Sequence, residues 1–196
     1  MKVIYIRDSK SKGYIRVGLG DGEEKLDFTV SESEYVSLGS FLCGDDVEDI
    51  EALRACDMRY RAKLYALRIL SYGNNSASTL KRKLILKSIS PGVAAEVCKE
   101  MIGLGYINED AQLRSLIENE ANSKLSGRRK IIPKLIAKGY KKENIELVLE
   151  DLISHGIVDF NENKRKLIEK KLTRGAGAAE KRKLLYSYGY SVDDSF

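Results

Sequence analysis

An internal repeat of about 50 residues constrains this chain more than any other feature of its sequence. The pairs aligned by a shift of 51 positions include Leu80 with Ile131, Leu84 with Leu135, Val97 with Val148 and Gly105 with Gly156. A shift of 50 positions aligns Leu135, Gly139 and Tyr140 with Leu185, Gly189 and Tyr190. Apolar residues at helical spacing inside such a period indicate small helix clusters, each with an apolar side that the neighbouring cluster covers.

The repeat predicts a mainly α fold: tandem three-helix repeats in an elongated, curved array, preceded by a small N-terminal element with about three short β-strands. The expected divisions are residues 1–57 for the N-terminal element, 58–107 for repeat 1, 108–159 for repeat 2 and 160–196 for a truncated repeat 3. In repeat 3 only about five residues are left for a third helix, which is too short to be stable alone.

The first thirty residues alternate apolar and polar side chains, as strands do. The pattern is clearest over residues 3–6, 14–17 and 26–30, and Gly20-Asp21-Gly22 before the last of these is typical of a hairpin. Because three short strands form a marginal sheet, we expect this sheet to pack on the helices that follow. Ser31 and Glu34 have the spacing of a capping box, which predicts a short helix over about 32–38. The acidic run at 44–51 lacks the spacing of a calcium loop and indicates a solvated helix start.

Helical spacing and helix-breaking residues then predict three helices in each complete repeat. The first helix of repeat 1 is expected to bury Tyr60, Leu64, Leu67 and Leu70, and the third to bury Leu104 just before Gly105. The middle helices are expected to begin with Ser76 and Ser126 as N-caps. Pro133 falls early in the middle helix of repeat 2, where it either removes a hydrogen bond or shifts the helix start.

The residues available for catalysis or metal binding are few. The one histidine, His155, lies near the end of a predicted helix, where a structural role is expected. The three cysteines, Cys43, Cys56 and Cys98, have no metal-ligand or disulfide spacing, which favours reduced structural thiols. We therefore expect no enzyme activity, no metal and no cofactor. The absence of a long apolar run and of a signal-peptide pattern predicts a soluble cytoplasmic protein with no membrane partner.

Positive charge gives the strongest functional indication. Residues 1–57 have 7 Lys and Arg against 13 Asp and Glu, whereas residues 58–196 have 27 against 16. The basic residues cluster in the middle helices of the three repeats and in the helix before the last of them. The candidate binding residues are Lys81, Arg82, Lys83, Lys87, Arg128, Arg129, Lys130, Lys134, Lys138, Lys164, Arg165, Lys170, Lys171, Arg174, Lys181, Arg182 and Lys183. Lys166 extends the fourth cluster. A cationic surface that recurs in stacked repeats can follow phosphates or acidic side chains through many weak contacts.

Several segments of residues 60–191 together resemble the RecX regulatory proteins. They are Ser76-x-x-x-Leu80-Lys81-x-Lys83-Leu84, Gly105-Tyr106-Ile107-Asn108-Glu109, Gly127-x-x-Lys130-Ile131-x-x-x-Leu135-x-x-Lys138-Gly139-Tyr140 and Gly189-Tyr190-Ser191. The family commonly has arginines where Ser187 and Tyr188 stand. The resemblance implies a non-enzymatic regulator that binds the RecA–DNA filament and suppresses RecA's ATP hydrolysis, coprotease action and strand exchange.

Two functional hypotheses follow. In the first, the protein is a monomer that binds the RecA filament through its basic repeat surface, touching both acidic protein and single- or double-stranded DNA, and so modulates recombination, DNA repair and the SOS response. In the alternative, it is a general helical DNA-binding protein that uses the same cations on phosphates without RecA. A steep loss of DNA affinity with salt in the absence of RecA favours the alternative. Simultaneous change of Arg128, Arg129 and Lys130 to Ala is expected to weaken binding and leave the fold intact.

Overall fold

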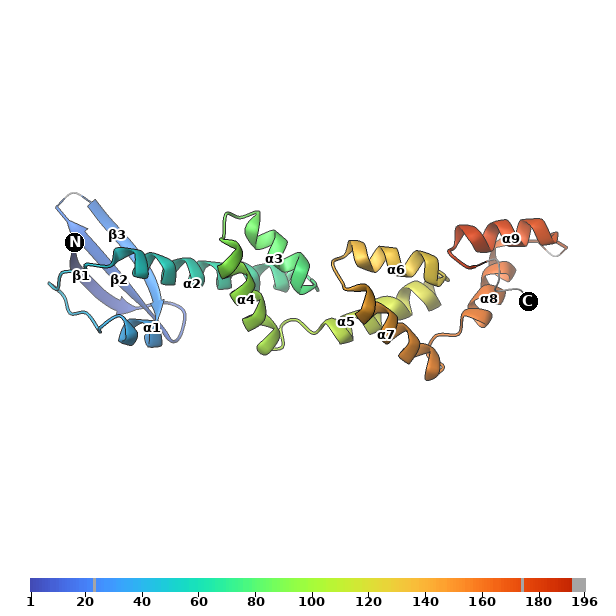
Figure 1. Ribbon diagram of the computed structural model, residues 1–196, viewed down its shortest axis with the longest axis horizontal. Coiled ribbons are helices and arrows are strands. Elements are labelled where there is room, and N and C mark those ends of the chain that lie inside the picture. The colour runs from blue at the N-terminus through green and yellow to red at the C-terminus, as the bar shows by residue number, and fades with distance from the viewer. Residues whose placement is uncertain (23, 174, 192–196) are drawn as a thin grey trace. The chain divides into compact units, whose positions relative to one another are not determined.

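The computed structural model describes residues 1–22, 24–173 and 175–191, and these begin with an antiparallel sheet (Figure 1). Its strands, in the order β1-β2-β3, are β1 (Lys2–Asp8), β2 (Tyr14–Asp21) and β3 (Glu24–Ser31). The three strands confirm the expectation from alternation. β2 is longer than predicted and runs through Gly18 and Gly20, each of which lies beneath a side chain of β1.

One face of the sheet is buried against the helix that follows, as expected for so small a sheet. Val17, Leu19 and Val30 are fully buried and pack with Leu53 of α2 (Ile50–Ser71). The backbone N–H of Thr29 on β3 donates to Oδ1 of Asp57 on the same helix at 3.0 Å. The start of α2 therefore completes the core of the sheet and also satisfies a donor on its outer strand.

Helix starts in this region follow the predicted capping chemistry. The short α1 (Glu32–Ser37) has the expected capping box, in which Ser31 and Glu34 exchange side-chain and backbone hydrogen bonds. The side chain of Asp49 caps α2 by accepting from the N–H of Ala52 at 3.0 Å, which confirms the acidic run as a helix start. As one continuous helix, α2 spans the limit predicted between the N-terminal element and repeat 1.

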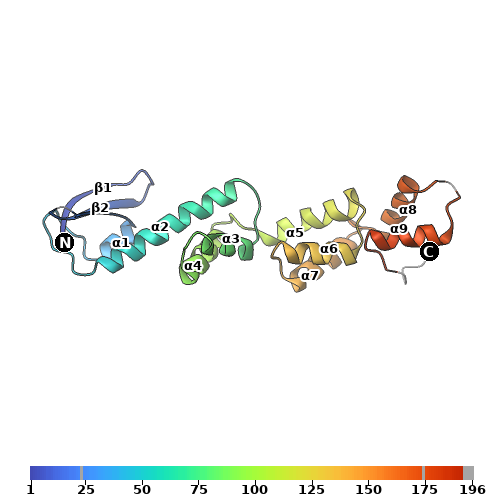
Figure 2. The same ribbon diagram turned by 90° about the horizontal axis from the view of Figure 1, so that it is seen from above.

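The remaining helices occur in the predicted order (Figures 1 and 2). Repeat 1 continues with α3 (Ala77–Ile85) and α4 (Pro91–Gly103). Repeat 2 contains α5 (Glu109–Glu118), which continues into a π-helical turn η1 (Asn119–Ser123), and then α6 (Arg128–Ala137) and α7 (Lys142–Ser154). Repeat 3 contains α8 (Phe160–Lys171) and α9 (Ala178–Ser187). The short third helix expected in repeat 3 lies outside the described residues.

The chain forms two compact units. One comprises Met1–Gly73 with Leu80–Met101, and the other comprises Asn74–Thr79 with Ile102–Phe196. The limits of these units differ from those of the sequence repeats, so the predicted division into repeats stays a prediction. None of the described helices is long and apolar enough to cross a membrane.

The sequence repeat has a clear structural counterpart. Leu84, Leu135 and Leu185 are buried at equivalent positions of α3, α6 and α9. Four residues after each of these leucines, a residue with positive φ follows the end of the helix. These residues are Ser88 with a φ of 63°, Gly139 with 86° and Gly189 with 85°. Glycine adopts this left-handed conformation without steric cost, which explains why it recurs after the middle helices. In repeat 1 a serine adopts the same conformation.

Three local predictions were wrong. Leu64 is 45% exposed, because α2 instead buries Ala62 and Ala66, and Leu64 lies about 200° around the helix from Ala62. Leu104 is 62% exposed, because α4 ends at Gly103 and the next residue no longer follows the helical period. Gly127, rather than Ser126, is the N-cap of α6, and it makes no side-chain cap.

Candidate interaction surface

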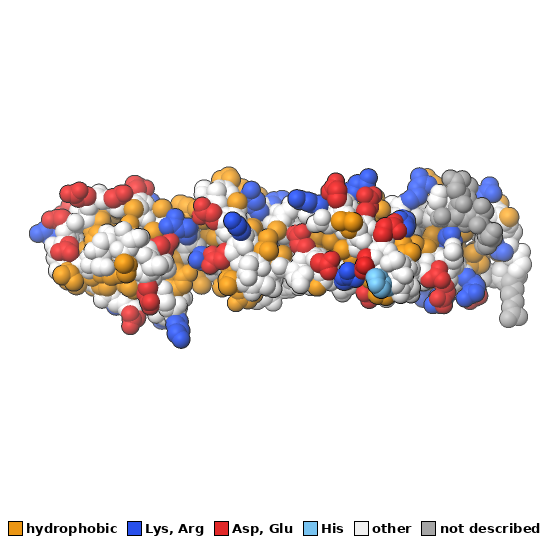
Figure 3. Space-filling model, turned by 60° about the horizontal axis from the view of Figure 1, so that its bottom comes forward, with side chains coloured by type: hydrophobic (Ala, Val, Ile, Leu, Met, Phe, Trp, Pro, Cys, Tyr) orange, Lys and Arg blue, Asp and Glu red, His pale blue; other side chains and the backbone are white. Residues whose placement is uncertain are grey.

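The predicted cations occupy the expected helices, α3, α6, α8 and α9, and most of them are exposed. The exposed set is Arg82, Lys83, Lys87, Arg128, Arg129, Lys130, Lys134, Lys138, Arg165, Lys170, Lys171, Arg182 and Lys183. Lys81 and Lys181 are partly exposed, and Arg174 lies outside the described residues. Figure 3 shows basic and acidic side chains interspersed with hydrophobic ones, both over the sheet and over the helices.

Lys164 differs from the other candidates because only 8% of it is exposed. It lies on the inner face of α8, one turn before the buried Leu167. Its amino group is 5.9 Å from the centre of the Tyr190 ring and donates to Oδ1 of Asn161 at 3.3 Å. A long aliphatic stem lets lysine be buried while its charged end keeps polar contacts, and cluster counting alone does not detect this.

Two of the exposed cations on α6 are held by ion pairs within repeat 2. Arg128 pairs with Glu150 of α7, and Lys134 pairs with Glu120 of η1 at 2.7 Å. Glu120 is 4% exposed and also pairs with Lys124 at 2.6 Å. Burial by itself raises the pKa of Glu120, but hydrogen bonds from the two lysines outweigh it and hold the pKa below its ordinary value. Lys134 therefore has a structural role in neutralising a buried carboxylate.

The N-terminus of α6 packs against the residues that follow α9. The N–H of Gly127 donates to the carbonyl of Tyr188 at 2.8 Å, and the N–H of Arg129 donates to that of Gly189 at 3.1 Å. A Cβ at Gly127 would strike the Gly189 carbonyl, so the close approach requires glycine. The hydroxyl of Tyr190 donates to the carbonyl of Leu125 at 3.1 Å. The Gly-Tyr pair after α9 is thus the contact by which repeat 3 joins repeat 2.

Aromatic rings of repeat 3 lie under the three consecutive cations at this junction. Arg128 lies 5.8 Å from the Phe160 ring centre, Arg129 lies 5.8 Å from that of Tyr186, and Lys130 lies 4.8 Å from that of Tyr188. Such pairs contribute about 0.5–1 kcal/mol each at exposed sites. Although these residues are exposed, they also hold the junction, so replacing all three with Ala changes packing as well as charge. Tyr188 supplies one of the rings.

A cavity of about 630 Å³ opens beside this junction and brings several predicted cations together. Arg128, Arg129 and Lys164 line it, together with Asp159, Glu162 and Tyr190. Both cations and carboxylates line the cavity, which does not give it a strong preference for a phosphate.

A second junction of the same kind lies in the same compact unit, between residues 76–79 and the residues that follow α6. Oγ of Ser76 and Oγ1 of Thr79, at the start of α3, each donate to the carbonyl of Lys138 at 2.8 Å. A Cβ at Gly139 would lie 2.7 Å from that Ser76 oxygen. The hydroxyl of the next residue, Tyr140, donates to Oε1 of Gln112 at 2.7 Å. The Gly-Tyr pairs after α6 and α9 thus perform the same joining role, which the sequence analysis did not assign although their recurrence after the middle helix was visible.

Each middle helix has, on it or at its end, a cation without an ion pair to any described residue. The described residues are 1–22, 24–173 and 175–191. Arg82 lies on α3, Lys138 follows α6 and Arg182 lies on α9, and all three are exposed. Arg165, Lys170 and Lys171 have the same property on α8. These residues are the candidate contacts for an anionic partner, because none of them forms an ion pair with a carboxylate of the described residues.

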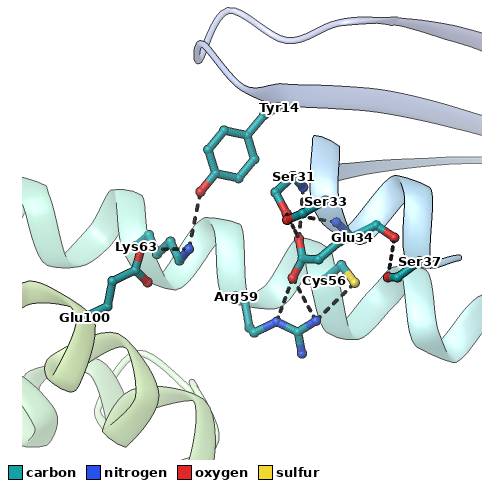
Figure 4. A network of polar contacts seen from close by, with 9 residues as sticks. All are labelled: Tyr14, Ser31, Ser33, Glu34, Ser37, Cys56, Arg59, Lys63 and Glu100. Atoms are coloured by element: carbon teal, nitrogen blue, oxygen red, sulfur yellow. Dashed lines mark hydrogen bonds and ion pairs between the residues drawn. The ribbon is translucent and has the colours of Figure 1, made fainter.

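A separate polar network lies within the first compact unit and joins the acidic N-terminal element to α2 and α4 (Figure 4). The guanidinium of Arg59 on α2 pairs with Glu34 of α1 at 2.8 Å and donates to the Cys56 sulfur at 3.1 Å. Lys63 contacts Tyr14 of β2 at 3.4 Å and Glu100 of α4 at 2.9 Å. Burial raises the pKa of the Cys56 thiol, which favours the protonated, unreactive form. The network connects β2, α1, α2 and α4, and its charged groups therefore have a structural role.

The remaining groups considered for chemistry also have structural environments. His155 is the C-cap of α7, and its Nδ1 lies 2.8 Å from the carbonyl of Asp151, as a structural histidine at a helix end is expected to do. Cys98 is buried, and burial raises the pKa of its thiol, whereas Cys43 is exposed. In the part of the chain that the structure describes, no three His, Cys, Asp or Glu side chains are grouped to hold a metal ion.

Comparison with known proteins finds several relatives, although no family model matches the chain. The regulatory protein RecX of Caldanaerobacter subterraneus subsp. tengcongensis is 30% identical over 133 residues, which cover 68% of this chain and 66% of that protein. The regulatory protein RecX of Listeria innocua serovar 6a is 26% identical over 134 residues, 67% of this chain and 49% of the relative. The chain thus spans about two thirds and about half of the lengths of these two relatives.

Solved structures show the same fold over a larger share of the chain. A crystal structure described as regulatory protein RecX superimposes with a TM-score of 0.74 at 23% identity, covering 98% of this chain and 95% of that one. RecX from Lactobacillus salivarius gives a TM-score of 0.57 at 22% identity, covering 70% of this chain and 91% of that one. The first likeness includes the N-terminal sheet, which the sequence resemblance did not cover.

Proposed function

The chain belongs to the RecX family of regulatory proteins, and on this premise we propose that it binds the filament formed by RecA recombinase on DNA and restrains RecA's ATP hydrolysis, coprotease and recombination activities. Such an activity modulates DNA repair and the SOS response in the cytoplasm, with the protein acting as a monomer and as a regulator rather than an enzyme.

One observation supports the proposal most directly: on or just after each middle helix, there is an exposed cation that forms no ion pair with any residue that the structure describes. Arg82, Lys138 and Arg182 are these cations. A cation that is not already paired gains more from an external carboxylate or phosphate, because no existing contact has to be broken. Repetition of the feature suits a partner that is itself a repeating polymer.

The alternative is a general DNA-binding protein, for which the same cations contact phosphates directly. The two functions differ in how binding depends on salt and on the presence of RecA. Direct phosphate binding releases about one counterion for each contact and weakens steeply with salt, whether or not RecA is present. Binding to a filament adds contacts with RecA that bare DNA lacks, so the proposed function predicts a higher affinity for the filament than for bare DNA at equal salt.

The proposal is tested by measuring affinity for RecA-coated and for bare single-stranded DNA at several salt concentrations. The key variant is R82A/K138A/R182A, and the matched control is K12A/K25A/K99A, which removes three exposed cations from the sheet region and α4. We expect wild-type protein to prefer the coated DNA, the key variant to lose about tenfold in filament affinity, and the control to bind like wild type. Equal affinity for coated and bare DNA, with the same salt dependence, would support the alternative instead.

A further inference from the structure

A smaller cavity, of about 360 Å³, lies where the start of α6 meets the end of α9, within the second compact unit. The residues that line it are Arg129, Lys130, Tyr186, Ser187 and Gly189. Among the described residues, none with a carboxylate lines this cavity, whereas Asp159 and Glu162 line the larger one. We call the smaller cavity the junction groove. It combines positive charge with an aromatic ring.

The two cations of the junction groove are not neutralised by a described carboxylate. Arg129 and Lys130 are both exposed, and neither forms an ion pair with any residue that the structure describes. Arg128, one residue earlier, pairs with Glu150 instead. Arg129 and Lys130 lie beside tyrosine rings, and a cation on an aromatic ring keeps its charge. The groove can therefore attract an anion without breaking an ion pair between described residues.

The aromatic ring of the junction groove is largely open to solvent. Tyr186 is 63% exposed, whereas Leu185, the residue before it, is 7% exposed and packs in the core of repeat 3. The guanidinium of Arg129 lies over the Tyr186 ring, 5.8 Å from its centre. Because the helix and the cation position the ring while most of the residue faces solvent, the ring offers a flat surface on which a second planar group can stack.

The composition of the junction groove favours one class of partner. Sites for single-stranded nucleic acids combine cations, which follow the phosphates, with aromatic rings, on which bases stack. Protein partners usually bury an apolar centre, and none of the described residues that line the groove is aliphatic. Bases in a double helix are already stacked on one another, so an open ring suits a single strand. The groove therefore matches a single strand better than a duplex or an acidic protein.

We propose that the junction groove binds a nucleotide of single-stranded nucleic acid, with the base stacked on Tyr186 and the neighbouring phosphates on Arg129 and Lys130. The inference rests on the proposed function for its setting, in which the strand is the DNA of the RecA filament. It deepens that function by assigning a contact with the DNA strand, rather than with RecA, to one place on the surface. Its test uses bare DNA, so it can fail while the proposed function stands.

Stacking on Tyr186 is tested by a fluorescent reporter. The chain contains no tryptophan, so Tyr186→Trp introduces a single indole at the groove. Tyr106→Trp is the matched control, because Tyr106 is a 55% exposed tyrosine of the same compact unit that does not line the groove. A base that stacks on an indole quenches its emission. We expect oligothymidylate to quench Tyr186→Trp and to leave Tyr106→Trp unchanged. Equal responses of the two variants would overturn the inference.

Affinity for oligothymidylate at several salt concentrations separates the ring from the cations. Y186L should lose about tenfold with an unchanged salt dependence, and Y186F, which keeps the ring, should stay within about twofold of wild type. R129Q/K130Q should bind more weakly and lower the slope of log affinity against log salt by about 1.4, or about 0.7 for each phosphate contact. The control K12Q/K25Q, which removes two exposed cations from the sheet region, should bind like wild type.

Melting temperature and affinity for the RecA filament are measured for the same variants, because Tyr186 and Arg129 also contact each other at the junction. Wild-type affinity for oligothymidylate in Y186L, or an equal loss in Y186F, would overturn the inference. A loss by Y186L of filament affinity alone would overturn it in favour of a protein contact. Equal affinity of wild-type protein for the filament and for bare DNA would overturn the proposed function and leave the groove assigned to a single strand.

Discussion

Replacement of Gly127 by Ala tests the junction between repeats 2 and 3 most sharply. The added Cβ would lie 2.6 Å from the carbonyl carbon of Gly189 and 2.8 Å from the nitrogen of Tyr190. Both are backbone atoms, which cannot rotate away as a side chain does. The φ of −83° and ψ of 170° at Gly127 suit alanine, so the expected effect is a clash and not backbone strain.

The cost follows from the contacts that the clash would separate. The junction must open enough to lose the hydrogen bonds from the N–H groups of Gly127 and Arg129, which contribute about 1 kcal/mol each. Gly177 provides a matched control, because it is the N-cap of α9, has a φ of −69° and ψ of 162°, and has no atom within 4 Å of an added Cβ. Loss of chain entropy in the unfolded state and the poorer capping by Ala apply to both variants. Their difference isolates the junction at about 2 kcal/mol.

Hydrogen exchange of the amides of α9 is the suitable assay, because a two-unit chain need not unfold in one step. A difference of about 2 kcal/mol corresponds to about thirtyfold faster exchange in Gly127→Ala than in Gly177→Ala. Equal exchange rates in the two variants would refute the reasoning, since they would show that the close approach of Gly127 to Gly189 contributes nothing to holding α9.

Three further predictions concern the second compact unit. Ser76→Ala removes a donor to the Lys138 carbonyl and should cost about 1–2 kcal/mol in urea unfolding, whereas Ser78→Ala, at an exposed neighbour, should cost less than about 0.5. Because the folded pKa of Glu120 is lowered, its contribution to stability is present above its unfolded pKa of about 4.3 and is lost as the pH falls through the folded value. Glu120→Gln should therefore destabilise the protein at pH 7 and make its urea midpoint less dependent on pH between about 5 and 2; an unchanged dependence would show that this carboxylate does not contribute. Leu135→Ala, at a side chain only 1% exposed, should cost about 2–5 kcal/mol, and a cost below about 1 would mean that the site is loosely packed.

Periodicity in the sequence was sufficient to predict the helix order and much of the core. Leu84, Leu135 and Leu185 were placed inside because they recur at a fixed position, and the structure confirms their burial. The strands and the capping box of α1 were found because alternation and the Ser-x-x-Glu spacing depend on local geometry. Such features need no knowledge of what packs against the element.

Features that depend on tertiary contact were missed. Ala62 and Ala66 are the buried residues of α2, although their small side chains give a weaker apolar signal than Leu64. The Gly-Tyr pairs were recognised as repeat marks, but their joining role depends on where Gly127 and Ser76 lie in space.

The candidate surface was predicted only in part, because the environment of each cation also depends on tertiary contacts. The clustered cations lie on or next to the helices that the sequence predicted, and most of them are exposed, while their role in binding stays a prediction. Sequence alone did not distinguish cations that pair with no described carboxylate, such as Lys138, from those that neutralise Glu120 or lie on aromatic rings. It also did not separate Lys164, which is buried, from its exposed neighbour Arg165.

The central claim, that the chain regulates RecA through the cations on and next to its middle helices, is tested most directly by the single-stranded-DNA-dependent ATP hydrolysis of RecA from the same organism. We expect wild-type protein to inhibit hydrolysis at levels well below those of RecA. R82A/K138A/R182A should need about tenfold more protein for the same inhibition, while K12A/K25A/K99A should inhibit like wild type. Unchanged hydrolysis at saturating wild-type protein would contradict the account.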